Sequence, residues 1–192
     1  MAPRALVLIT DGNEEMEAVI SIDILRRGGV DVTVAGLNGP NTVECSRHVK
    51  IVPDIGLAAV KDKTAFDAII LPGGMGGAEA FSKSSTVHGL LNQYYSQQKL
   101  VAIICASPIV LKAAQVAKGR SVTSHPSVKD QLVQDYNYKE ERVVVDGNLI
   151  TSRGPGTAFE FALAVVKKLQ GPEKLKEIIP PMICNDEIVK SV

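Results

Sequence analysis

The stretch LVAIICASP, residues 100–108, decides the fold class of this chain. Its first five residues form a short, continuous apolar run rich in Val and Ile, which is typical of a buried parallel strand. Small residues and Pro108 then predict a sharp turn into a helix, because proline suits a first helical turn. Cys105 is therefore expected where the strand ends, at the sheet edge where open α/β sheets bind their ligands. A core cysteine is the alternative, since free cysteine is commonly buried, but the strand–Cys–small–helix pattern favours a nucleophile.

The segments on either side repeat this alternation of strand and helix. Residues 4–10 (RALVLIT) and 31–36 (DVTVAG) are predicted parallel strands, joined by a helix that starts at residue 14 and stops at Gly28-Gly29. Residues 66–71 (FDAIIL) form the next core strand and end in the glycine loop of residues 72–77. Two hairpins are predicted, one of residues 43–45 with 49–52 and one of residues 143–145 with 149–151. Helices are predicted over residues 87–98, 109–114, 157–169 and 173–179, with Thr157 as the cap of the third. A short strand over residues 121–123 and a short helix from His125 to Leu132 complete the predictions. This order predicts one doubly wound α/β domain over residues 1–192.

Composition excludes several classes of function. The 192 residues carry 21 Lys and Arg against 21 Asp and Glu, and 45% are hydrophobic. This balance gives no support to a dedicated nucleic-acid or membrane-surface binder, and no apolar stretch reaches the length of a membrane span. The N-terminus lacks a secretory signal pattern, and three cysteines at unrelated spacings, Cys45, Cys105 and Cys184, indicate reduced thiols rather than a disulfide framework. We therefore expect an intracellular protein.

Four segments follow predicted strands and should meet at one sheet edge: residues 11–17, the Gly73-Gly74 loop, Cys105, and residues 123–126. The glycine loop matches no phosphate-binding motif. It is either a tight turn without a ligand, or it brings the backbone N–H of Gly74 close to Cys105 as an oxyanion donor. The residues leave both alternatives open.

Glu17 is the acidic residue most able to affect that thiol. Glu14 and Glu15 are explained by the favourable position of acids at a helix start, whereas the helical period turns Glu17 toward the crevice. A thiol with a pKa of ~8.5 is only ~3% ionised at pH 7, and lowering that pKa by about 3 requires about 4 kcal/mol. A helix N-terminus supplies roughly 0.3–2 kcal/mol and a charge-assisted hydrogen bond roughly 1.5–3 kcal/mol. The hypothesis is a coupled Cys105–Glu17 pair that shares one proton.

The histidines allow weaker predictions. His125 follows a strand end and is either a helix-entry residue or a group that orients or protonates a substrate. His48 stands three residues after Cys45, but two more ligands at a suitable spacing are absent, so no zinc site is predicted. His88 is expected on the surface, and Cys184 in an irregular tail. We predict no metal and no cofactor.

Taken together, the motifs resemble the Parkinsonism-associated deglycase family, often called DJ-one, within the superfamily of PfpI-type proteases and class I glutamine amidotransferase domains. The resemblance spans nearly the whole chain and rests on six segments: GNEEMEA around Glu17, VTVAGLNG at 32–39, CSR at 45–47, ILPGG at 70–74, AIICASP at 102–108 and LITSRGPGTAFEFAL at 149–163.

This resemblance implies a flavodoxin-like α/β sandwich, a homodimer, and a cytoplasmic location with the nucleus and mitochondria as further compartments. It implies that Cys105 is an oxidation-sensitive nucleophile, that Glu17 is its hydrogen-bonded acid, and that His125 lies in the same pocket, with backbone N–H groups of Gly74 and Ala106 at the sulfur. The implied activity is a glyoxalase or deglycase acting on methylglyoxal, a small dicarbonyl, and on early glycation adducts of proteins. A non-enzymatic redox sensor or chaperone controlled by oxidation of Cys105 to a sulfinate is the alternative. A nucleotide binder is disfavoured, since no phosphate-binding signature is present.

The chain departs from its relatives at two positions. Ala106 stands where PfpI-type proteases carry a histidine, which removes the general base and argues against proteolysis. Ser107 replaces the glycine common in the same turn. Arg47 and Arg153 match basic positions near the family's pocket and dimer seam, where anion binding and structural ion pairing are both open.

Overall fold

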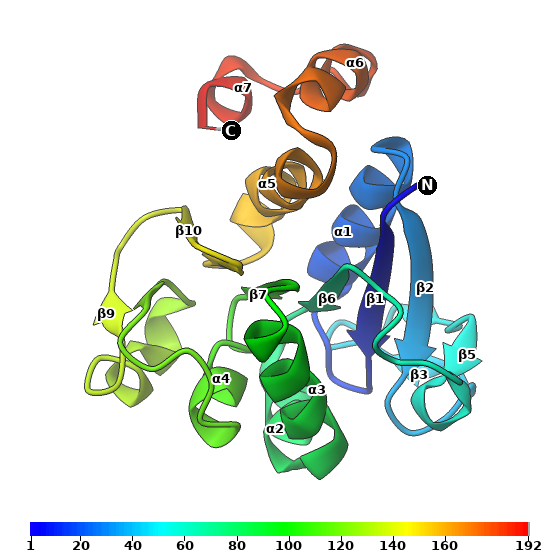
Figure 1. The fold of residues 1–192 in the computed structure, drawn as a ribbon, viewed down its shortest axis with the longest axis vertical. Helices are drawn as coiled ribbons and strands as arrows, with labels where there is room; N and C mark the ends of the chain where they lie inside the picture. The colour runs from blue at the N-terminus through cyan, green and yellow to red at the C-terminus, as the bar shows by residue number, and fades with distance from the viewer. Residues whose placement is uncertain (192) are drawn as a thin grey trace.

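A seven-stranded sheet forms the centre of the computed structural model, which describes residues 1–191 (Figure 1). The strand order is β10-β11-β7-β6-β1-β2-β5, and every neighbouring pair is parallel except the antiparallel β10–β11 hairpin. The strands are β1 (Arg4–Ile9), β2 (Asp31–Gly36), β5 (Ile55–Gly56), β6 (Ala68–Leu71), β7 (Leu100–Ile104), β10 (Val143–Asp146) and β11 (Leu149–Ser152).

Helices cover both faces of this sheet, which explains why its central strands are apolar throughout rather than alternating. Figure 1 shows α1, α5, α6 and α7 on one side and α2, α3 and α4 on the other. Their bounds are α1 (Glu15–Arg27), α2 (Met75–Lys83), α3 (Ser85–Ser96), α4 (Ile109–Ala113), α5 (Ala158–Gln170), α6 (Pro172–Met182) and α7 (Asp186–Ser191). Strand β1 divides its side chains between two apolar cores, with Val7 and Ile9 in the α1 and α5 core and Leu6 and Leu8 in the other.

The topology confirms the predicted doubly wound, flavodoxin-like architecture. With the hairpin and edge strands set aside, the order β2-β1-β6-β7-β11 is the flavodoxin order 2-1-3-4-5. The strand order reverses between β1 and β6, because β1 leads into α1 on one face and β6 into α2 on the other. Ligands bind such sheets at this switch point, outside the carboxyl ends of the strands.

The short elements follow the predicted pattern closely. The structure contains the hairpins β3 (Val43–Glu44) with β4 (Lys50–Ile51) and β10 with β11, both at the predicted positions. The remaining short elements are β8 (Ser121–Val122), β9 (Asn137–Tyr138) and the 3₁₀ helices η1 (Leu57–Ala59), η2 (Pro126–Gln131) and η3 (Pro155–Thr157). Strand β8 pairs with β9 in a separate two-stranded sheet, so it does not extend the main sheet.

Three details differ from the sequence predictions. Residues 75–77 begin the nine-residue helix α2 instead of continuing a loop, and a Cβ on Gly77 would lie 2.0 Å from the Asn13 amide nitrogen. Gly77 is thus required by the close approach of Asn13. A glycine-rich stretch in a sequence can mark either such a close approach or a turn, and the two cannot be told apart by composition. Thr157 stands before α5, but its hydroxyl oxygen accepts from Arg153 N–H and Gly154 N–H, so it closes η3 rather than capping α5. Cys184 lies between two helices, because α6 continues to Met182 and α7 follows.

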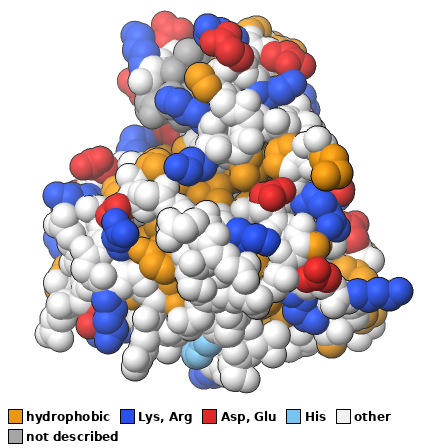
Figure 2. All heavy atoms as spheres, viewed as in Figure 1, with side chains coloured by type: hydrophobic (Ala, Val, Ile, Leu, Met, Phe, Trp, Pro, Cys, Tyr) orange, Lys and Arg blue, Asp and Glu red, His pale blue; other side chains and the backbone are white. Residues whose placement is uncertain are grey.

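The surface agrees with the balanced composition. On the face drawn in Figure 2, basic and acidic side chains are interspersed. Within residues 1–191, no helix is both long enough and apolar enough to cross a membrane.

Candidate active site

A cavity of about 400 Å³ opens at the carboxyl edge of the sheet, beside the switch point. The β1–α1, β6–α2 and β7–α4 connections, the tip of the β3–β4 hairpin and the start of η2 all contribute to its wall. The lining residues are Gly12, Glu14, Ser46, Arg47, Gly74, Met75, Gly76, Cys105, Ala106, His125, Ser127 and Pro155. The structure thus brings the four predicted segments together. A second hollow of about 430 Å³, lined by residues such as Leu57 and Lys83, contains no thiol, carboxyl or imidazole group.

Cys105 ends β7 with its backbone in the left-handed region, at a φ of 68°. A non-glycine residue adopts this conformation only where its surroundings impose it. Here the Cys105 N–H donates to Ser152 O (3.0 Å), and the His125 N–H donates to Cys105 O (2.7 Å). Two neighbouring segments therefore fix the main chain of the residue, and its side chain, 7% exposed, reaches the floor of the cavity.

Glu17 lies beneath Cys105 on the first turn of α1 and is completely buried. Its Oε2 accepts a hydrogen bond from Gly73 N–H (2.7 Å), while Oε1 has no hydrogen-bond partner among the described residues. The carboxyl also contacts the Cys105 thiol, and burial raises the pKa of Glu17 to about 8. Glu17 is therefore mostly protonated at neutral pH.

The thiol itself experiences opposing effects. Burial raises the pKa of Cys105 to about 12, and an ionised Glu17 contributes to this rise, although backbone N–H groups of Gly74 and Ala106 act in the opposite direction. The repulsive effect of Glu17 disappears once that carboxyl holds its proton, and its O–H then becomes a third donor to the sulfur. The free energy that the sequence analysis assigned to the Cys105 thiolate did not include the cost of burying its charge. It also overestimated the stabilisation by the helix dipole, because α4 is only five residues long.

The glycine loop after β6 packs directly on this pair. A Cβ on Gly73 would lie 2.3 Å from Cys105 Cβ and 2.6 Å from Glu17 Oε2, so no side chain fits there. Gly74 has a φ of 82° and directly precedes α2. The buried amide of Asn13 donates to Gly73 O (2.7 Å) and more weakly to Pro72 O (3.3 Å). Asn13 thus anchors the loop, a role that its place in an ordinary turn sequence, Asp11-Gly12-Asn13, did not reveal.

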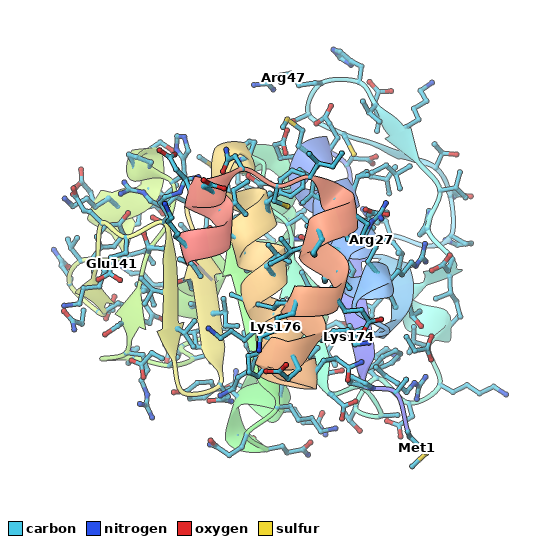
Figure 3. All side chains as sticks on the ribbon, turned by 90° about the horizontal axis from the view of Figure 1, so that it is seen from above. Met1, Arg27, Arg47, Glu141, Lys174 and Lys176 are labelled. Atoms are coloured by element: carbon cyan, nitrogen blue, oxygen red, sulfur yellow. The ribbon has the colours of Figure 1, made fainter. Side chains whose placement is uncertain are left out.

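His125 and Arg47 both line the cavity. The His125 Nδ1 accepts from Ser127 N–H (3.2 Å) and lies 2.8 Å from Ser127 Oγ, so Ser127 orients the imidazole ring. Figure 3 shows Arg47 at the tip of the β3–β4 hairpin, and its guanidinium donates to Ser46 O (3.1 Å). Arg153 lies outside the cavity lining, between β11 and η3, and its N–H donates to Thr157 Oγ1.

Two acidic residues that the sequence explained by the helix end have more specific contacts. The Glu14 carboxylate caps α1 by accepting from Glu17 N–H (2.8 Å). The buried Glu15 carboxylate accepts from Ser46 Oγ (2.9 Å) and Arg47 N–H (2.8 Å). Glu15 thereby holds the β3–β4 hairpin against α1 and places Arg47 at the cavity.

The Cys45 and His48 pair forms no ligand set. Burial raises the pKa of Cys45 to about 11, and His48 Nδ1 instead lies 2.8 Å from the Glu44 carboxylate. Among residues 1–191, no three His, Cys, Asp or Glu side chains form a group that would hold a metal ion.

The sequence and the fold of this chain are both similar to those of known proteins. Residues 3–168 match the model of a family described as the DJ-1/PfpI family. The chain is 54% identical over 180 residues to "Protein dj-1beta" of Drosophila melanogaster, covering 93% of this chain and 95% of that protein. The crystal structure of Drosophila melanogaster DJ-1beta superposes with a TM-score of 0.94 at 51% identity, covering 96% of this chain and all of the other. "Glutathione-independent glyoxalase DJR-1.2" of Caenorhabditis elegans is 41% identical over 180 residues, covering 93% and 95% of the two chains.

Proposed function

The chain belongs to the DJ-1/PfpI family, and from this premise we propose that it is a cofactor-independent glyoxalase that converts methylglyoxal to lactate at Cys105. One observation carries the proposal: Cys105 lines a cavity and its thiol contacts the buried carboxyl of Glu17, whose pKa burial raises to about 8. The relative whose name describes a glutathione-independent glyoxalase supports this choice of reaction.

The reaction is an internal redox isomerisation followed by hydrolysis, so its atoms balance without an external oxidant or reductant. The sulfur attacks the aldehyde carbon to form a hemithioacetal, and the aldehyde oxygen takes a proton from Glu17. The Glu17 carboxylate then removes the hydrogen from that carbon, and the neighbouring ketone oxygen is protonated to give an enediol. Return of a proton to the former ketone carbon yields a lactoyl thioester, and water hydrolyses it to lactate and the free thiol.

Each residue at the cavity has a role in this scheme. The N–H groups of Gly74 and Ala106, which lower the pKa of the Cys105 thiol, also stabilise a negative sulfur before attack. His125 lines the cavity, where its imidazole can donate a proton to the ketone oxygen. Arg47 offers a positive charge at the rim for the lactate product.

Lactate production from methylglyoxal without glutathione tests the proposal. We expect repeated turnovers for the wild type and a loss of at least about a hundredfold in Cys105→Ser and Glu17→Leu, because an attacking group and a proton carrier are then missing. Undiminished lactate formation by Cys105→Ser would refute the assignment. Adding glycated protein tests the deglycase variant of the activity, which requires that adducts disappear faster than free methylglyoxal is removed.

A redox sensor is the second candidate, and the same donors favour it. Oxidation of the thiolate by two molecules of hydrogen peroxide gives a sulfinate and two molecules of water. Glu17 O–H and the N–H groups of Gly74 and Ala106 can each bind an added oxygen. Stoichiometric gain of two oxygens at Cys105 by intact mass, together with no lactate turnover, would favour sensing or a chaperone role over the enzyme.

We also propose a homodimer formed through α1 and the β3–β4 hairpin. Met16 and Val19, one turn apart on α1, are about half exposed, as is Val49 on the hairpin, and Val52 beside the hairpin is 69% exposed. Glu15 holds these two elements together, so their apolar side chains form a joint surface. Light scattering should give a dimer for the wild type and a monomer for Val19→Asp. A wild-type monomer at micromolar concentration would contradict this.

A further inference from the structure

Ser107 is completely buried in the turn that follows Cys105, where it donates its hydroxyl proton to Pro72 O at 2.6 Å. This bond connects the turn after β7 with the glycine loop after β6. Its acceptor, Pro72 O, otherwise receives only the longer bond from the Asn13 amide among the contacts that the structure describes. Ser107 therefore supplies the stronger restraint on that carbonyl.

The next two residues of the loop touch the reactive pair. Gly73 N–H donates to Glu17 Oε2, a Cβ on Gly73 would lie 2.3 Å from Cys105 Cβ, and the Gly74 N–H lowers the pKa of the Cys105 thiol. The absence of space for a Cβ on Gly73 shows that loop and pair are in van der Waals contact. A small displacement of the Pro72 peptide thus changes both contacts.

We propose that Ser107 is a positioning residue, whose hydroxyl sets the distance between the Gly73-Gly74 backbone and the Cys105 sulfur through the Pro72 carbonyl. The turn that follows Cys105 and the glycine loop that follows β6 then move as one unit. A side chain at position 107 without a hydroxyl leaves this link unmade while the turn itself is retained, because Ser107 N–H still donates to Ile104 O. The effect of Ser107 on turnover rests on the proposed function, whereas its effect on the pKa of the Cys105 thiol does not.

The charged and titratable groups around the sulfur are Glu17 on α1, Glu14 and His125 at the N-caps of α1 and η2, and Arg47 on the hairpin. None of them contacts the Ser107 hydroxyl, whose acceptor is a backbone carbonyl. A change at position 107 therefore reaches the sulfur through the backbone donors. Loss of the Gly74 contact weakens a donor that lowers the pKa of Cys105, so that pKa should rise.

The test is the pH dependence of Cys105 alkylation by iodoacetamide, followed by mass spectrometry of the Cys105 peptide. In Ser107→Ala we expect the midpoint to move to higher pH and the rate at pH 7 to fall about two- to tenfold, the range expected for one lost hydrogen bond. Ser107→Thr keeps the hydroxyl and should remain within about twofold of the wild type. Ser21→Ala is the matched control, because Ser21 is equally buried and its hydroxyl has no partner among the described residues.

An alkylation profile of Ser107→Ala that superimposes on the wild type would overturn the proposal, as would an equal shift in Ser21→Ala. If Ser107→Ala does not fold, Ser107→Gly removes the same hydroxyl with less steric change and takes its place. Alkylation needs no dicarbonyl substrate, so a protein that makes no lactate but shows the shift contradicts the proposed glyoxalase and supports the role of Ser107. For an active enzyme, Ser107→Ala should lower kcat while KM stays nearly constant.

Discussion

Replacing Glu17 by glutamine should stabilise the folded protein at neutral and alkaline pH, because the site disfavours a charged carboxyl. The pKa of Glu17 rises from 4.5 to about 8 on folding, chiefly through burial. Between these values the folded state holds a proton that the unfolded state has lost. The free energy of unfolding therefore falls as the pH rises through this window.

The size of the effect follows from the width of the window. At pH 7 the loss of stability is about 3 kcal/mol, and it approaches about 5 kcal/mol above pH 8, since one pH unit corresponds to ~1.4 kcal/mol. Glutamine has the same shape, accepts from Gly73 N–H and stays neutral, so Glu17→Gln avoids this loss. Near pH 4.5 both proteins carry a neutral side chain, and their stabilities should converge.

Urea unfolding at pH 5, 7 and 8.5 measures this difference. We expect Glu17→Gln and the wild type to be nearly equal at pH 5 and to separate by several kcal/mol at pH 8.5, with unchanged m values. Glu79→Gln is the control, because Glu79 is an exposed helix residue paired only loosely with Lys83 at 3.9 Å. Parallel stability curves for wild type and Glu17→Gln across this range would refute a raised Glu17 pKa.

Three further changes test other contacts. Gly73→Ala should abolish Cys105 alkylation at neutral pH, because the added Cβ would lie 2.3 Å from Cys105 Cβ, whereas Gly89→Ala, in open space on α3, should leave it unchanged. Glu17→Leu should slow alkylation at least about tenfold relative to Glu17→Gln, since only glutamine keeps a hydrogen-bond donor beside the sulfur; equal rates would argue against donation by Glu17. Arg142→Ala should lower the free energy of unfolding by about 2 kcal/mol, because it leaves Glu160 buried without its 2.6 Å partner. The exposed pair of Arg27 and Asp23 gives the comparison, and Arg27→Ala should cost less than about 1 kcal/mol.

Patterns of apolar residues predicted the central sheet well, because parallel strands buried on both faces have a distinctive composition. The runs at residues 31–36 and 100–104 coincide with β2 and β7. Helix α2 was missed because a glycine-rich start resembles a loop, although Gly77 is required by the close approach of Asn13. Only the three-dimensional contact separates these two uses of glycine.

At the site, the sequence brought Cys105, Glu17 and His125 to one sheet edge because the carboxyl ends of parallel strands meet there. It did not identify Asn13 or Glu15, and it noted Ser107 only as a departure from the family, because the partners of these three side chains lie at least 31 residues away along the chain. Local patterns contain no information about hydrogen bonds of that range. The burial cost on the thiol was also missed, because a strand-end position does not determine how much water reaches the sulfur.

The position of Cys105 at the cavity has a kinetic consequence. Both a dicarbonyl and a peroxide reach its sulfur through this one opening. A sulfur bonded to an aldehyde carbon has no free thiolate for an oxidant, so the two reagents compete for one atom. Cells rich in dicarbonyls would then keep this cysteine reduced for longer, and the degree of its oxidation would report the ratio of peroxide to aldehyde rather than peroxide alone.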